Sequence, residues 1–370
     1  MSDDMSLKKE RQVNLELLRM LSMYMVVVMH LFATGTERLA EADFGGISYF
    51  AVWYVNTLCH VATICFILIS AYFLVMLPFR LSRLLRLWLM VLFYTVSGLL
   101  LSFVFSRLSV SRGDLLYAFF PVTSSAYWFI TQYFLLVSIS PLLNRLIRSL
   151  TKEEHRRTIL LLMILFSVIP TFFFWSEDYF SDGYDLPWLV TVYFVGAYIR
   201  LHGLTISRPG LKYFAAALFL TVSRVVLGAA AIRLTGSFHG AGLLYHGGLF
   251  HMFMAVCLFS VFQRFEIKNK LCTKYINYIA SCAVGVYLLH QNRFFPELSV
   301  LARLEECGNR FWRIIPRVLT LALVIFVLGV AAEAFRKQLA RLCREKELCA
   351  RLDRKAESLL RRMDSARRST

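Results

Sequence analysis

The sequence lacks the signatures of the commoner nucleotide-binding, hydrolytic and metal-dependent sites. It contains no Walker loop, no G-x-S-x-G elbow, no H-E-x-x-H helix and no paired acidic cluster for a divalent ion. Its eight cysteines include no C-x-x-C pair, and four of them lie in apolar runs. We therefore predict no disulfide framework, no metal site and no bound cofactor.

Long polar stretches are also missing, and we find no soluble domain, internal repeat or low-complexity segment. Hydrophobic residues make up 58% of the 370 residues, and the mean hydropathy is +0.59. A soluble protein of this size is near half apolar. The excess comes in blocks of about 20 residues, the length that crosses a bilayer as a helix. Helices then satisfy every backbone hydrogen bond in lipid. We expect no cleavable signal peptide, because the first apolar run contains Glu16 and Arg19.

The sequence thus predicts an all-α, polytopic membrane protein with about ten transmembrane helices. We divide it into a cytoplasmic N-terminal segment (1–13), a transmembrane domain (14–334) and a basic amphipathic helix on the cytoplasmic leaflet (335–370). The predicted spans are 15–33, 50–77, 84–105, 126–147, 158–175, 187–199, 211–232, 243–262, 275–291 and 313–334.

Lysine and arginine are concentrated in alternate loops, which predicts that both termini are cytoplasmic. The basic segments are 8–11, 80–86, 145–157, 200–212, 264–274 and the tail. By contrast, the opposite loop 176–185 holds four acidic residues and no basic one. The net charge of +17 is therefore mainly a topology signal and an attraction to anionic lipid, not a sign of nucleic-acid binding.

The first apolar run carries three ionisable side chains on one helix face. Glu16 and Arg19 are three residues apart, and His30 follows Arg19 by eleven residues. Eleven residues bring His30 back to within about 20° of Arg19, about 16 Å along the axis. Ionisable groups inside membrane helices are costly and usually functional. The alternative is an ion pair that snorkels to the headgroups and a histidine bonded within the core.

Other polar residues gather at the ends of predicted spans. Arg80, Arg83 and Arg86 repeat every third residue at the start of a helix, a pattern that suits phosphate binding or simple anchoring on the cytoplasmic side. Trp128 and Tyr133 fall where an outer aromatic belt or a sugar-stacking surface would lie. His290 ends the ninth span at the outer mouth.

These residues resemble the motifs of the integral-membrane acyltransferase-3 family, bacterial enzymes that O-acetylate cell-surface glycans. The resemblance covers 14–334. Its most specific element is the acid, arginine and histidine of Glu16, Arg19 and His30. The arginine pair Arg83 and Arg86 also matches. Further matches are the segments 66–73, 128–144 and 287–290, with Ala71 in place of the usual glycine.

The resemblance implies a membrane O-acyltransferase of the bacterial cytoplasmic (inner) membrane. Acyl-CoA, in the simplest case acetyl-CoA, would be the co-substrate, with its phosphates on Arg83, Arg86 and Arg80. His30 would act as the base, while Glu16 and Arg19 would hold the helix start and the donor entrance. The acceptor would be a hydroxyl of a surface or lipid-linked glycan, near Trp128, Tyr133 and His290. The alternative from another class is a flippase or transporter of a lipid-linked saccharide.

Overall fold

The computed structural model describes residues 12–33, 43–106, 111–172, 185–235, 248–295 and 303–368. The structure is 83% helix, and no strand occurs in the described ranges, as the all-α prediction requires. In chain order the helices are α1 (Val13–Ala33), α3 (Ile47–Cys59), α4 (Ala62–Leu74), α5 (Leu81–Ser106), α6 (Arg112–Phe119), α7 (Trp128–Ser149), α8 (Lys152–Met163), the π-helical turn η1 (Ile164–Val168), α9 (Ile169–Phe172), α10 (Leu186–His202), α11 (Pro209–Thr235), α12 (Leu249–Gln263), α13 (Lys270–Ala280), α14 (Ala283–His290), the short 3-10 turn η3 (Leu304–Cys307), α16 (Phe311–Leu342) and α17 (Glu345–Arg368).

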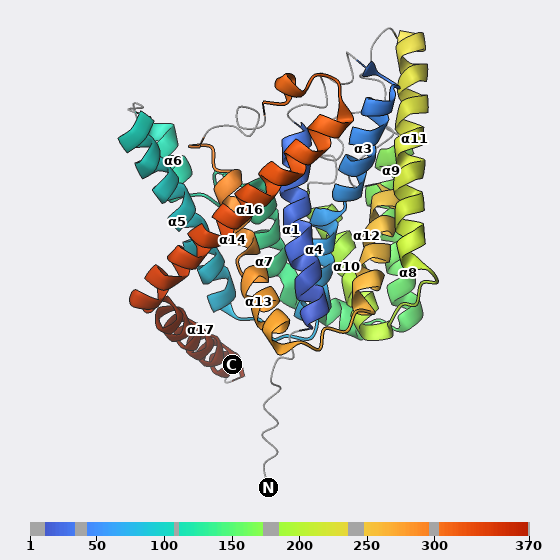
Figure 1. The fold of residues 1–370 in the computed structure, drawn as a ribbon. Helices are drawn as coiled ribbons and strands as arrows, with labels where there is room; N and C mark the ends of the chain where they lie inside the picture. The colour runs from blue at the N-terminus through green and yellow to red at the C-terminus, as the bar shows by residue number, and fades with distance from the viewer. Residues whose placement is uncertain are drawn as a thin grey trace.

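Helix α1 lies in the middle of the bundle (Figure 1). It packs against α3, α4, α12, α13, α14 and α16, elements from both halves of the chain. Its buried side chains are mostly large and apolar, and Leu15, Leu18, Val27 and Leu31 are fully buried. The helix that carries Glu16, Arg19 and His30 is therefore the one around which the others assemble.

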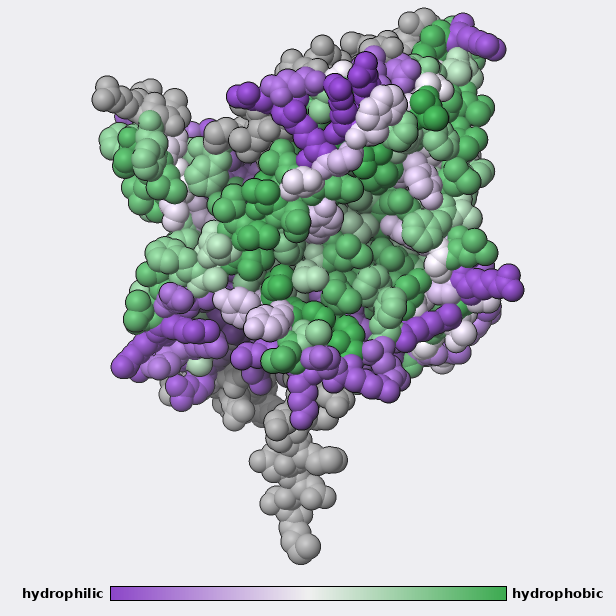
Figure 2. Space-filling model, viewed as in Figure 1, coloured by the Kyte–Doolittle hydropathy of each residue, from purple (hydrophilic) through white to green (hydrophobic). Residues whose placement is uncertain are grey.

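Six helices within the described residues are long and apolar enough to cross a membrane. They correspond to six of the predicted spans: α1, the stretch Ile47–Leu74, α5, α7, α11 and α16. The other four predicted spans fall on α8 to α9, α10, α12 and α13 to α14, which are shorter or interrupted. On the face shown in Figure 2, the hydrophobic surface forms a band between two polar ends. This is the surface expected of a multi-pass membrane protein.

Two predicted spans are broken where we expected continuous helices. The span 50–77 breaks at His60 and Val61, between α3 and α4, and the span 275–291 breaks at Ser281 and Cys282, between α13 and α14. Side chains satisfy backbone groups at the first break, since His60 Nδ1 lies 2.8 Å from the Asn56 carbonyl oxygen. Apolar runs alone do not reveal such breaks, because the residues on both sides remain hydrophobic.

Small side chains let α4 and α10 approach closely. A Cβ on Gly196 would lie 2.7 Å from the Ala71 Cβ and 2.8 Å from the Leu68 carbonyl oxygen. Small residues at helix interfaces of membrane proteins allow this kind of packing. The sequence pair Ser70 and Ala71 thus lies at a close helix contact.

The C-terminal region differs from a single amphipathic helix over 335–370. Helix α16 continues through position 334 to Leu342, the chain turns at Cys343 and Arg344, and α17 begins at Glu345. Arg344 has a φ of 51°, a left-handed conformation that ends a helix. Helix α17 packs against α5, and its Asp353 carboxylate accepts a hydrogen bond of 2.8 Å from the Ser82 backbone N–H. The boundary drawn at 334 therefore lies inside a helix, and part of the tail packs on the bundle.

Candidate active site

A pair of histidines joins α1 to α14 within the bundle. His30 Nδ1 lies 2.9 Å from His290 Nε2, and their ring centroids are 5.2 Å apart. Gln291 Nε2 lies 2.9 Å from the same His30 nitrogen. Both histidines are half-buried. The structure thus brings together His30 of the first apolar run and His290, which the sequence placed at the outer mouth of the ninth span.

The hydrogen bonds of His290 assign a tautomer to the pair. His290 Nδ1 lies 2.7 Å from the Val286 carbonyl oxygen, which can only accept, so Nδ1 carries a proton. In a neutral imidazole the other nitrogen, Nε2, must then accept, and His30 Nδ1–H is its donor. Gln291 would then point its amide oxygen, rather than its amide nitrogen, at that N–H. The two amide atoms look alike, so the hydrogen-bond network decides their assignment. His30 Nε2 keeps a lone pair, which gives this side chain the capacity to take a proton.

The ion pair at the start of α1 has the predicted geometry. Arg19 Nη1 lies 2.6 Å from Glu16 Oε2, and Glu16 is only 6% exposed. The neighbouring Asn14 donates to the Phe262 carbonyl oxygen at 3.0 Å, which ties this end of α1 to α12. The ion pair thus lies within α1, at the end that Asn14 ties to α12, and His30 lies near the other end of the same helix.

A row of aromatic rings leads from α7 to the histidine pair. Tyr133 stacks on Phe129 with ring centroids 6.0 Å apart, and Phe129 lies 5.9 Å from Tyr287. Tyr287 in turn lies 6.5 Å from His30 and 5.8 Å from His290. The row forms an apolar wall that connects the first turns of α7 with the half-buried imidazoles.

The predicted acceptor-site residues of α7 lie along this row. The Tyr133 hydroxyl contacts Ser70 Oγ of α4 at 3.3 Å. Trp128 lies at the first position of α7 and packs edge-on against Phe129 at 5.7 Å. Both residues thus lie at the α7 end of the aromatic row.

The three arginines occupy the start of α5. Arg80 directly precedes the helix and Arg86 lies on its second turn, and both are exposed, while Arg83 is half-buried. Arg86 Nε donates to the Ser82 carbonyl oxygen at 3.0 Å. Because exposed guanidinium groups flank a helix N-terminus, this surface favours anions.

Two further polar residues of the apolar spans have clear neighbours. Arg224, in the middle of an apolar run, lies over the Trp53 ring with its guanidinium carbon 3.4 Å from the ring centroid. This is a cation–π contact, which stabilises a buried guanidinium. The His60 ring lies 6.0 Å from the His251 ring, in addition to its contact with Asn56. His251 is buried and His60 is half-buried, so the two rings pack within the bundle.

Sequence reasoning missed several polar residues near the pair. Gln291 was passed over although it adjoins His290. Glu333 and Arg336 form a buried ion pair at 2.8 Å near the end of the last apolar run. The spacing of three between an acid and an arginine at a span end is the same signal that singled out Glu16 and Arg19. Tyr94 carries no such signal, because a tyrosine in an apolar run resembles any core aromatic.

The helical bundle and its bonded histidines define a multi-pass membrane protein with a proton-accepting group inside. A family model described as an acyltransferase domain matches residues 12–334. The chain belongs to this family, the acyltransferase-3 family, and is a membrane acyltransferase. The search of curated proteins and that of solved structures found no match to the chain.

Proposed function

We infer that this acyltransferase moves an acyl group, most simply acetyl, from cytoplasmic acyl-CoA to a hydroxyl of a lipid-linked or cell-surface glycan. The observation that carries the proposal is the bonded pair of His30 and His290, at 2.9 Å, on the helix that also carries the Glu16–Arg19 ion pair. The pair leaves His30 Nε2 as the group that can take the acceptor proton.

Arg80, Arg83 and Arg86 would bind the phosphates of the donor. Guanidinium groups form bidentate, charge-assisted hydrogen bonds with phosphate oxygens. The aromatic row from Tyr133 to Tyr287 leads to His30, which supports the assignment of Trp128, Tyr133 and His290 to the acceptor. The acyl end of the donor would reach into the membrane toward His30, and the acceptor would approach from the outer side past Trp128, Tyr133 and His290.

The chemistry would be a direct transfer. The acceptor hydroxyl oxygen attacks the thioester carbonyl carbon while His30 Nε2 takes the hydroxyl proton. The C–S bond then breaks, and the leaving thiolate takes that proton from His30. His290 would hold the imidazole in the required tautomer and offset the charge that develops on it. Glu16 and Arg19 would fix the start of α1 near the donor entrance.

For the topology, we propose ten crossings of a bacterial cytoplasmic membrane with both termini in the cytoplasm. The start of α1 and helix α17 lie toward the same end of the molecule, which supports this arrangement (Figure 1). A cysteine introduced at exposed Ser124 should react with an impermeant thiol reagent from outside, and one at exposed Lys152 should not. Labelling of position 152 from outside would overturn the orientation.

Purified protein in lipid nanodiscs tests the reaction itself. We expect it to release CoA from radiolabelled acetyl-CoA and to label a lipid-linked saccharide acceptor. His30→Ala should lower both signals by a factor of about 100 or more. Mass spectrometry of surface glycans with and without the gene then identifies the modified sugar. Movement of an unmodified lipid-linked saccharide across the bilayer, with no acetyl transfer, would favour a flippase instead.

A further inference from the structure

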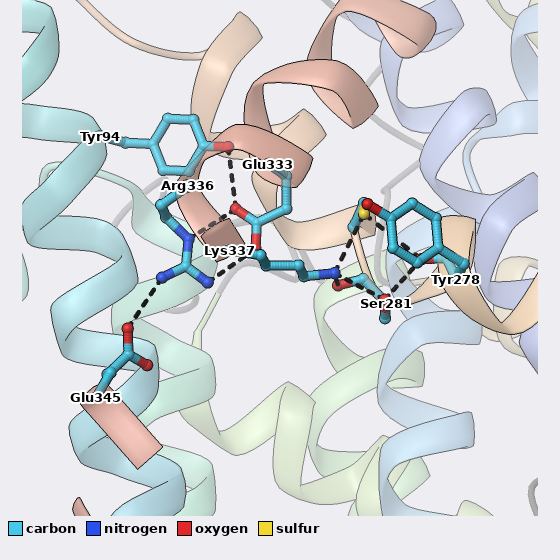
Figure 3. Close-up of polar contacts among 8 residues, drawn as sticks. Tyr94, Tyr278, Ser281, Glu333, Arg336, Lys337 and Glu345 are labelled. Carbon is cyan, nitrogen blue, oxygen red and sulfur yellow. Dashed lines mark hydrogen bonds and ion pairs between the residues drawn. The ribbon is translucent and has the colours of Figure 1, made fainter. Parts of the chain in front are cut away.

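Polar side chains of α16 form a buried network where this helix passes α5 and α14 (Figure 3). Glu333 is fully buried, and Arg336 donates to both of its carboxylate oxygens, at 2.8 Å from Nε and 2.9 Å from Nη2. The Tyr94 hydroxyl donates to Glu333 Oε2 at 3.1 Å. Arg336 Nη1 also reaches Glu345 of α17 at 3.2 Å. Such groups are costly to bury and define one geometry when every member is bonded.

The next residue of α16, Lys337, forms hydrogen bonds at the break between α13 and α14. Lys337 Nζ donates to the Ser281 carbonyl oxygen at 2.9 Å and to the Ser281 hydroxyl at 2.7 Å, and it lies 3.2 Å from Cys282 Sγ. The ammonium group also lies 5.4 Å from the centroid of the Tyr278 ring (Figure 3). A cation at the C-terminal end of α13 satisfies a carbonyl group there and complements the helix dipole. Lys337 thereby bonds the chain at the point where α13 ends and α14 begins.

The start of α14 lies directly against the network. A Cβ on Gly285 would come 2.6 Å from the Glu333 Cβ and 2.7 Å from the Tyr94 hydroxyl oxygen. Only a glycine permits an approach this close. Glu333 and Tyr94 therefore contact α14 five residues before His290.

The far end of α14 is held by the backbone of the same tyrosine. Asn292 Nδ2 donates to the Tyr94 carbonyl oxygen at 2.8 Å, and Asn292 is only 4% exposed. A Cβ on Gly98, one turn further along α5, would lie 2.5 Å from the Asn292 amide nitrogen. Tyr94 thus contacts both ends of the short helix whose last residue is His290, next to Gln291.

We propose that Tyr94, Glu333, Arg336 and Lys337, the α14 clamp, position α14 so that His290 and Gln291 meet His30 at hydrogen-bond distance. All four are positioning residues, since they act through His290 rather than on a substrate. The proposal rests on the proposed function, because it describes how the base of that reaction is held. The bidentate Arg336–Glu333 geometry fixes both carboxylate oxygens, which a lysine at position 336 could not do.

Hydrogen exchange of the full chain in nanodiscs tests the clamp without any turnover. Tyr94→Phe removes one hydroxyl, Lys337→Met removes the ammonium group, and Glu333→Gln keeps the side-chain volume. We expect each variant to exchange amides of 283–292 faster than wild type, with α1 unchanged. The matched control is Glu347→Gln, which alters an exposed carboxylate on α17. Unchanged exchange of α14 in both Tyr94→Phe and Lys337→Met overturns the proposal, even if Glu333→Gln does not fold.

Steady-state kinetics then separates positioning from a general loss of structure. Tyr94→Phe should lower kcat about tenfold with little change in the KM for acyl-CoA, because displacement of a catalytic group by about 1 Å is costly. In a His290→Gln background the same substitution should cause almost no further loss. Equal losses in both backgrounds would show that the clamp does not act through His290. If wild type itself transfers no acyl group, the proposed reaction fails while the exchange result still decides whether α14 is clamped.

Discussion

Two polar regions of the bundle are built in contrasting ways. The arginines at the start of α5 lie at the edge of the bundle, two of them exposed, next to a helix from the tail. The histidine pair lies between α1 and α14, where both nitrogens of His290 and the Nδ1 of His30 have partners. A charged surface that water can reach tolerates rearrangement, whereas a bonded pair in an apolar bundle is held in one geometry. Substitutions should therefore affect binding at the first region and the chemical step at the second.

The largest effect is expected at His30. His30→Ala should lower acyl transfer by a factor of about 100 or more, the usual contribution of a general base. The variant should still fold, because alanine is a good helix former. Only the neutral imidazole accepts a proton, so wild-type activity should fall as the pH is lowered through the titration of this pair. The measurement is initial rate against pH, with His60→Ala and His251→Ala as controls that retain most activity. A near wild-type rate in His30→Ala would place the base elsewhere.

Arg83→Ala and Arg86→Ala should act on donor affinity instead. Each removes a charge-assisted phosphate contact worth about 1.5–3 kcal/mol, and lysine at either position should restore part of it. Titration of CoA by calorimetry measures the loss directly. Unchanged affinity in both alanine variants would mean that these arginines serve only to orient the protein in the membrane.

His290→Gln should have a smaller effect on the rate than the loss of His30. The base remains in place but loses the partner that orients it. Loss of a residue that orients a functional histidine typically lowers activity by about tenfold or more. The affinity for CoA should stay at the wild-type value, in contrast to the arginine variants. A loss as large as that of His30→Ala would instead indicate that His290 itself exchanges a proton with the substrate.

The smallest effect is expected where the tail meets α5. Asp353→Asn removes the negative charge that faces the Ser82 N–H at the start of α5, an interaction worth about 0.3–1 kcal/mol. Limited proteolysis should cut α17 faster in this variant than in wild type. The rate of acyl transfer should change by less than about twofold. A large loss of activity would mean that α17 forms part of the donor site rather than a support for it.

Local patterns account for the features that were predicted well. Apolar runs of span length placed α1, α5, α7, α11 and α16, and a spacing of three placed Glu16 against Arg19. The same patterns failed at the breaks after Cys59 and Ala280, because an apolar run continues through a break when both helices stay in the bundle. They also failed for the tail, which forms two helices, one of them packed on α5.

The sequence by itself determined that this is an all-helical membrane protein, which residues carry charge into its apolar spans, and which of them share a helix face. These properties depend on residues within a few turns of one another. Only the tertiary structure decided that His30 meets His290, 260 positions away, and that Tyr94 meets Glu333, 239 positions away. The physical reason is that a helix fixes the direction of each side chain about its own axis, whereas the partner depends on which helices pack together. That choice is made by close contacts such as those at Gly196 and Gly285, which no periodicity in the sequence reveals.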